Sequence, residues 1–328
     1  MQINYYFRNT SSTNFSIENV FCTIINALQK ACTISVYYTR SPIDFVSIFK
    51  VRNLKADVHH ITGAVNYLAF GLPGKRTIIT VHDIGHYTET LTGWRKVIYK
   101  YFFLVLPLRK VTAVTTISDF TKEQLIKEFN IAPTKITVIP NPVNPAFTFI
   151  AQRMNALPVI LQIGAGYNKN IDKLLEAVKG LKVKLLLIRK PDNELMRKLK
   201  DNNIFFEFRS NLSEHELIQA YADSDIVYFA STYEGFGLPI IEAMALGRPV
   251  ITSRISPMKE IGEDAAVIVD PLNISEIRSS IVSLIESKEL YHQLVERGSV
   301  VVKKYRSEGV AMQYKLLYES LLRDVAHA

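Results

Sequence analysis

The stretch from Phe229 to Ser253, FASTYEGFGLPIIEAMALGRPVITS, places two acids on either side of the turn GFGLP. The segment DIVYFAS, which ends within this stretch at Ser231, predicts a buried strand. The segment PIIEAMAL predicts a helix, in which Pro239 suits the first turn and Gly247 the C-terminal cap. The segment TYEGFG is therefore expected at the carboxyl end of a parallel strand, the edge at which open α/β sheets bind ligands.

The two acids in this stretch are Glu234, directly before the turn, and Glu242, about one turn inside the helix. Gly235 and Gly237 allow the backbone to approach a ligand closely, and the helix N-terminus offers N–H groups to a phosphate. Carboxylates accept hydrogen bonds from hydroxyls. Two such acceptors around a phosphate cradle suit a nucleotide sugar, which carries a ribose and a hexose on either side of its diphosphate. The alternative is structural, with Glu242 complementing the helix dipole and the glycines forming a tight turn.

Outward from this stretch, the chain alternates short apolar runs with segments of helical periodicity. Continuous apolar strands are typical of parallel sheets that are covered on both faces. The periodicity lapses between Pro145 and Pro158, and a length of 328 residues suits two domains. The sequence therefore predicts an α/β protein with two tandem Rossmann-like, doubly wound domains, at residues 1–150 and 151–328.

The composition is that of a folded protein, with 48% hydrophobic and 21% charged residues. The two cysteines, Cys22 and Cys32, have no metal-type spacing and favour a reducing compartment over disulfides. The first twelve residues lack the pattern of a signal peptide, and the apolar run 101–107 is too short to cross a bilayer. These features predict a cytoplasmic protein.

The positive charge is concentrated in the first half of the chain. Residues 1–150 contain 16 Lys and Arg against 8 Asp and Glu, whereas residues 151–328 contain 23 of each. Such a balance favours an anionic partner or serves only solubility. The segment 93–110, GWRKVIYKYFFLVLPLRK, has five cations, five aromatic residues and no acid. This composition suits a helix at an anionic membrane surface, and the alternative is a core helix with basic flanks. No nucleic-acid-binding motif is present, so no nucleic-acid partner is expected.

The string EGFGLPIIEAMALGRPV, starting at Glu234, resembles the EX7E signature of the family-4 retaining glycosyltransferases of GT-B fold. The resemblance covers most of the chain from about Asp57 and is strongest in residues 211–271. It implies that the two domains face a central cleft, with the acceptor bound by the N-terminal domain and the donor by the C-terminal one. It also implies that the last helix, at about 309–325, packs back on the N-terminal domain.

The activity implied by the resemblance is transfer of a sugar from a nucleoside diphosphate, UDP- or GDP-linked, to an acceptor hydroxyl with retention of configuration. The acceptor would be a saccharide or lipid-linked, in the assembly of cell-surface polysaccharide or glycolipid. No metal and no other cofactor is implied. The enzyme would act in the cytoplasm or peripherally on the cytoplasmic face of the membrane.

The donor-binding residues implied by the resemblance lie in the second half. Glu234 would contact hydroxyls of the donor sugar, and Glu242 the ribose. The sugar and diphosphate would meet the backbone of Gly235, Phe236, Gly237 and Leu238. In QIGAGYNKN, Gly164 and Lys169 resemble the family's phosphate-binding loop and lysine, although a surface lysine capping a turn is the alternative.

The phosphate-binding segment also departs from the family. Many members carry an arginine a few residues before the lysine, where this chain has Ala165 and Gly166. The missing cation is therefore expected from elsewhere in the second half. Candidates are Arg189, Lys190 and Arg209.

In the first half, TVHDIGHY ends a predicted strand with His82 and Asp83. The resemblance implies that a neutral His82 donates a hydrogen bond to a sugar hydroxyl, and that Asp83 lies on the acceptor side. The alternative for His82 is a strand-end histidine satisfied by backbone. His59 and His60 are expected in a strand at the edge of the core. The glycine-free loop 7–16 is expected to border the acceptor pocket or to be a surface loop.

Three other classes of protein fit parts of the pattern. A nucleotide-sugar epimerase shares the tandem architecture, whereas the related sugar phosphorylases have much longer chains. A non-catalytic scaffold subunit would also keep the fold, and its two acids would then have no role in turnover. Conversion of a donor without an acceptor would identify the epimerase, and the absence of any donor turnover would identify the scaffold.

Overall fold

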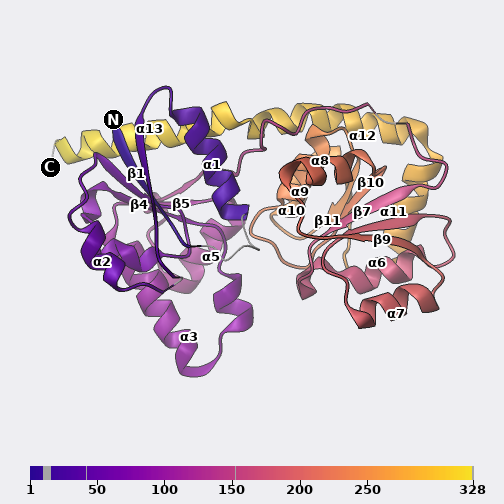
Figure 1. Ribbon diagram of the computed structural model, residues 1–328, viewed down its shortest axis with the longest axis horizontal. Coiled ribbons are helices and arrows are strands. Elements are labelled where there is room, and N and C mark those ends of the chain that lie inside the picture. The colour runs from indigo at the N-terminus through magenta and orange to yellow at the C-terminus, as the bar shows by residue number, and fades with distance from the viewer. Residues whose placement is uncertain (10–15, 42, 152, 327–328) are drawn as a thin grey trace. The chain divides into compact units, whose positions relative to one another are not determined.

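The computed structural model describes residues 1–9, 16–41, 43–151 and 153–326 (Figure 1). The chain forms two compact units: the first comprises Met1–Pro142 and Arg306–Ala328, and the second comprises Val143–Tyr305. Each unit contains a six-stranded sheet in which every neighbouring pair of strands is parallel. The prediction of an α/β protein with two doubly wound parallel sheets is confirmed.

The sheet of the first unit has the strand order β2-β1-β3-β4-β5-β6. Every residue of β3, β4 and β5 is buried, which is typical of parallel strands that are covered on both faces. The strands are β1 (Gln2–Phe7), β2 (Thr33–Tyr38), β3 (Val58–Ile61), β4 (Thr77–Val81), β5 (Ala113–Thr116) and β6 (Ile136–Val138). The α-helices are α1 (Ser16–Leu28), α2 (Val46–Val51), α3 (Gly93–Tyr99), α4 (Leu106–Lys110), α5 (Asp119–Phe129) and α13 (Ser307–Ala326).

The sheet of the second unit has the order β12-β11-β10-β7-β8-β9. Its first strand in the chain, β7, lies between β8 and β10, so the chain reverses direction across the sheet at the β7–β10 pair. This is the topological switch point at which doubly wound sheets bind ligands. The strands are β7 (Val159–Ile163), β8 (Lys184–Ile188), β9 (Phe205–Arg209), β10 (Ile226–Phe229), β11 (Val250–Ser253) and β12 (Val267–Val269). The α-helices are α6 (Ile171–Val178), α7 (Asn193–Asp201), α8 (Glu214–Ala222), α9 (Leu238–Ala245), α10 (Met258–Gly262), α11 (Ile274–Glu286) and α12 (Lys288–Val301).

The division between the units falls at 142/143, and the sequence placed it at 150/151. Residues 143–150 belong to the second unit through their own contacts. The Ile150 carbonyl accepts a hydrogen bond from the buried guanidinium of Arg248 at 2.8 Å, and the Phe147 and Tyr221 rings pack edge to face at 5.8 Å. These contacts are made to residues about 70 to 100 positions later, so the local lapse in periodicity did not reveal them.

Helix α13 belongs to the first unit and closes a buried polar network beneath α1. The Tyr318 hydroxyl lies 2.8 Å from the Tyr5 hydroxyl and 2.6 Å from Nδ1 of His60. The His60 Nε2 lies 2.8 Å from Thr80 Oγ1, and burial lowers the pKa of this histidine to about 3. His59 is also buried, with its Nδ1 2.7 Å from the Tyr6 hydroxyl. Both histidines lie in strand β3, as the sequence predicted, but inside the core rather than at its edge, and burial keeps them neutral.

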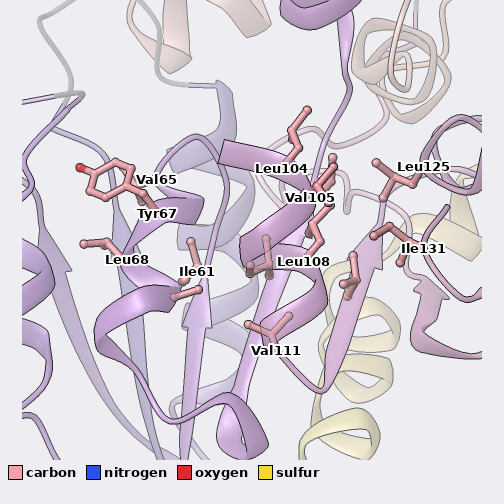
Figure 2. Packing of buried hydrophobic residues seen from close by; sticks show 14 of the residues in the cluster. Ile61, Val65, Tyr67, Leu68, Leu104, Val105, Leu108, Val111, Leu125 and Ile131 are labelled. Carbon is pink, nitrogen blue, oxygen red and sulfur yellow. The ribbon is translucent and has the colours of Figure 1, made fainter. Parts of the chain in front are cut away.

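The sequence predicted either a surface helix or a core helix for the segment 93–110, and each prediction describes one half of it. Its second half is core: Leu104, Val105 and Leu108 are buried and point into one cluster with residues of the neighbouring strands (Figure 2). Its first half is exposed, with Trp94 69% and Tyr101 51% accessible. No helix within the described ranges is both long enough and apolar enough to cross a bilayer.

Candidate active site

The loop after β7 folds a lysine back over the end of its own strand. Gly164 has φ +100°, and a Cβ on it would lie 2.7 Å from Cε of Lys169. The glycine therefore makes room for the lysine side chain. The Lys169 Nζ lies 4.7 Å from the Phe229 ring centroid and 2.5 Å from Oε1 of Glu234. The two parts of the chain that the sequence assigned to phosphate and sugar thus meet in one ion pair, in which the side chains are 19% and 16% exposed.

Asn168 ties the same two loops together. Its Nδ2 donates to the Tyr233 carbonyl at 2.8 Å and to Oε1 of Glu234 at 3.2 Å. The Thr232 amide donates to the Asn168 carbonyl at 2.8 Å. Asn168 is not among the predicted site residues, and its place directly before Lys169 and after a parallel strand is the signal in the sequence that points to it. Glu234 Oε1 thus receives hydrogen bonds from both an ammonium and an amide.

Helix α9 starts directly after the Glu234 loop. Gly237 has φ +145°, and a Cβ there would lie 2.9 Å from Cδ1 of Ile240, so this position requires glycine. Pro239 occupies the first turn, as predicted. Phe236 is buried, and its ring packs edge to face on Tyr305 at 5.8 Å. Its side chain anchors the loop, so only its backbone is placed to meet a ligand.

Glu242 lies on the second turn of α9, where it meets α8 rather than the lysine loop. The Tyr221 hydroxyl donates to Oε2 of Glu242 at 2.6 Å. Burial raises the pKa of Glu242 to about 7, and the hydrogen bond from Tyr221 opposes that rise. The sequence analysis did not identify Tyr221, because its contact joins two helices at positions 21 residues apart.

Among the three cations suggested as substitutes for the missing arginine, Arg189 lies next to the phosphate loop. It directly follows β8, and the Ile188 carbonyl accepts from the Gly164 amide at 3.1 Å. The Arg189 side chain is 11% exposed and pairs with Asp192 at 2.8 Å, and within the described chain its buried Nε has no hydrogen-bond partner. Lys190 is exposed. Arg209 is neutralised by two carboxylates, those of Glu207 at 2.6 Å and Asp223 at 2.8 Å.

The predicted site residues of the first unit lie at the end of β4. The His82 Nε2 donates to the Thr62 carbonyl at 2.8 Å, and burial lowers the pKa of this ring. A neutral His82 with its proton on Nε2 offers Nδ1 as an acceptor. This geometry differs from the expectation that it donates to a sugar hydroxyl. Asp83 is exposed and accepts from the Gly85 amide at 2.8 Å. The roles of His82 and Asp83 in the reaction stay predictions, and the loop 7–16 lies largely outside the described residues.

Comparison with known proteins gives matches over both units. The family model "Glycosyltransferase Family 4" matches residues 24–147, and "Glycosyl transferases group 1" matches residues 149–300. An MMP alpha-(1->4)-mannosyltransferase of Mycolicibacterium hassiacum is 27% identical over 81% of this chain and 69% of its own length. The O-antigen chain mannosyltransferase B of Escherichia coli is 26% identical over 81% of this chain and 76% of its own length. The crystal structure of Anabaena HepE in complex with UDP and glucose has a TM-score of 0.80 at 15% identity, covering 98% of this chain and 100% of that one.

The two sheets and these matches define the class of the protein, which is a glycosyltransferase of GT-B fold. The chain belongs to glycosyltransferase family 4, as the string around Glu234 and Glu242 predicted.

Proposed function

We propose that the protein transfers a sugar from a nucleoside diphosphate to an acceptor hydroxyl with retention of configuration. The observation that carries this proposal is the ion pair between Lys169 and Glu234, at the carboxyl ends of β7 and β10 and next to the start of α9. A bound donor would break the ion pair and provide a new partner for each of its two side chains. The diphosphate would take the ammonium, and the sugar hydroxyls would take the carboxylate.

The charge of the leaving diphosphate is met, in this proposal, by the protein alone. Lys169 supplies one cation, Arg189 next to Gly164 a second, and the first turn of α9 its amides and the positive end of its dipole. A metal ion is then not required. Turnover should be unchanged by an excess of EDTA and should gain no more than twofold from Mg²⁺ or Mn²⁺. A loss of turnover in EDTA that Mg²⁺ restores would contradict this part of the proposal.

Retention is proposed to follow from front-face displacement, in which the acceptor attacks on the side of the leaving group through an oxocarbenium-like state. Glu234 is a poor covalent nucleophile in this proposal, because its carboxylate accepts hydrogen bonds from the donor hydroxyls and from the Asn168 amide. Its proposed role is to accept hydrogen bonds from donor hydroxyls and so fix the sugar against the diphosphate cradle. Glu242, oriented by Tyr221, is proposed to accept hydrogen bonds from the ribose of a UDP- or GDP-linked donor.

The setting we propose is the assembly of cell-surface polysaccharide or glycolipid, with a saccharide or a lipid-linked acceptor. It is supported by the names of the relatives, one of which is an O-antigen chain mannosyltransferase.

Peripheral attachment to the anionic cytoplasmic face of a membrane is part of this proposal. It is supported by exposed apolar side chains on α2 and α3, with Phe49 73% and Trp94 69% accessible, beside the cations Arg95, Lys96 and Lys100. Pelleting with anionic vesicles that is lost at high salt is expected, and the absence of pelleting at any salt would contradict the attachment.

The proposed activity is tested by incubating the purified protein with a panel of UDP- and GDP-hexoses. Release of the nucleoside diphosphate is measured with and without saccharide acceptors, and the anomeric configuration of any product is read by proton NMR. Transfer with the donor's configuration supports the proposal. Inversion, epimerisation of the donor without transfer, or no turnover of any donor would contradict it.

A further inference from the structure

The first unit contains a cavity of about 520 Å³. Its lining includes Ile43 in the loop before α2 and residues of the segment from His86 to Phe103, which contains α3. The residues that line it are Arg8, Ile43, Ala64, His86, Leu91, Trp94, Arg95, Ile98, Tyr99 and Phe103.

The described lining of this cavity combines apolar side chains with cations. Of the ten lining residues that the structure describes, seven are apolar or aromatic, and the other three are two arginines and a histidine. None of these described lining residues carries a carboxylate or an amide side chain, the groups that accept and donate hydrogen bonds to several sugar hydroxyls at once. An amphiphile with an alkyl chain and an anionic group matches both halves of the lining, by apolar burial and by pairing with a guanidinium.

The cation available to such an anion is Arg95. Arg8 is paired with Glu18 at 3.1 Å, so its charge is already matched. The Arg95 guanidinium lies 5.6 Å from the ring centroid of Trp94, and in the described part of the chain no carboxylate lies within 4.0 Å of it. A phosphate at Arg95 would therefore sit next to an indole ring that faces the cavity.

The rim of the cavity continues onto an exposed apolar surface. Ile43, Trp94 and Ile98 line the cavity and are also 56%, 69% and 53% accessible. The elements on either side are joined by Phe45 and Phe102, whose rings pack edge to face at 5.4 Å. An alkyl chain that starts in the cavity can therefore continue over apolar side chains rather than into water.

We infer that this cavity binds a lipid-linked acceptor through its phosphate and the adjoining part of its alkyl chain. The phosphate pairs with Arg95, and the chain lies against Trp94, Ile98 and Phe103. This inference rests on the proposed function, since it names the class of acceptor for the same transfer reaction. Under this inference the acceptor is attached to an acyl or isoprenoid phosphate carrier and is not a free saccharide.

The test uses the intrinsic fluorescence of the protein, because Trp94 is its only tryptophan. The probes are dodecyl phosphate, dodecyl maltoside, maltose and inorganic phosphate, each below its critical micelle concentration where it has one. Dodecyl phosphate is expected to give a saturable blue shift of the emission and dodecyl maltoside a binding curve at least tenfold weaker. Maltose and phosphate are expected to give no shift. Equal or tighter binding of maltose, or a dodecyl phosphate response that appears only at micelle formation, would overturn the inference.

Two matched variants locate the anion. Arg95→Gln is expected to weaken dodecyl phosphate at least tenfold, or about 1.4 kcal/mol, and to leave dodecyl maltoside unchanged. Arg323→Gln, at an exposed arginine of α13 that does not line the cavity, is the control and should change neither. An Arg95→Gln protein that binds dodecyl phosphate as tightly as the wild type would also overturn the inference, and calorimetry on the same pair avoids any effect of the substitution on the indole emission.

Donor hydrolysis separates this inference from the proposed function. Release of nucleoside diphosphate without an acceptor depends on Lys169 and Glu234 in the second unit. If the protein hydrolyses donors but binds maltose better than dodecyl phosphate, the transferase activity is supported and the lipid-linked acceptor is refuted. If the protein binds dodecyl phosphate at Arg95 but turns over no donor, the anionic amphiphile is supported as the ligand of the cavity and the transferase activity is refuted.

Discussion

Replacing Glu242 by glutamine should stabilise the protein without its donor while weakening nucleotide binding. Glutamine has nearly the same volume, and its side-chain oxygen can still accept the hydrogen bond from the Tyr221 hydroxyl. What the substitution removes is a carboxyl that burial keeps partly protonated. A residue retained at a cost to the stability of the folded state is expected where it serves a ligand.

The size of the effect follows from the pKa of Glu242, which burial raises from its ordinary 4.5 to about 7. The folded state then holds the proton more tightly than the unfolded chain, so the free energy of unfolding of the wild type falls as the pH rises from about 4.5 to 7. Each unit of pKa difference corresponds to 1.36 kcal/mol, so the loss amounts to about 3 kcal/mol by pH 8. Glu242→Gln has no carboxyl at this position and escapes that loss.

Urea unfolding from pH 4.5 to 8.5 measures this difference directly. The stability of Glu242→Gln relative to the wild type should rise with pH by about 3 kcal/mol and level off near pH 8. Glu286→Gln, at an exposed acid on the end of α11, serves as the control and should show a flat difference. Added nucleoside diphosphate should stabilise the wild type more than Glu242→Gln. Parallel stability curves for Glu242→Gln and the wild type, or equal stabilisation by nucleotide, would refute this account of Glu242.

Three further substitutions test the lysine and glutamate loops. Glu234→Gln should reduce kcat about a hundredfold or more and leave the Kd of the nucleoside diphosphate within twofold, because its proposed contacts are to the sugar; near-normal turnover would rule out that role. Lys169→Met should weaken nucleoside diphosphate binding in calorimetry about ten- to a hundredfold, the value of a lost charge-assisted hydrogen bond, and an unchanged Kd would disprove phosphate contact. Gly164→Ala should weaken the same binding, since its Cβ would lie 2.7 Å from Lys169 Cε, and Gly180→Ala, at an open positive-φ glycine, is the control for backbone strain and should bind nucleotide normally.

The general architecture could be predicted because its signals are local. Runs such as TIITV at Thr77–Val81 carry no charged residue because both faces of the sheet are covered, and that is visible in the sequence. The position of Glu234 could also be predicted, since a glycine-rich turn between a strand and a helix lies at the carboxyl edge wherever the sheet is parallel. Lys169 was assigned through the resemblance of QIGAGYNKN to the family's phosphate-binding segment.

The contacts that orient these groups could not be predicted, because they join residues distant in the chain. Asn168 reaches Glu234 across 66 positions, and Tyr221 reaches Glu242 from another helix. The donor nitrogen of His82 is committed to the Thr62 carbonyl, and a Cβ at Gly63 would lie 3.0 Å from the His82 ring. Composition likewise predicted both a surface helix and a core helix for residues 93–110, because it does not tell which part of an apolar segment its neighbours cover.

The proposed transfer requires that the donor occupies the loops after β7 and β10. A crystal structure of the protein with an intact nucleotide sugar tests this directly. We expect the Lys169 ammonium within 3.5 Å of a diphosphate oxygen and the Glu234 carboxylate within 3.2 Å of a sugar hydroxyl, with their mutual contact broken. A donor bound elsewhere, with Lys169 and Glu234 still paired to each other, would contradict the account.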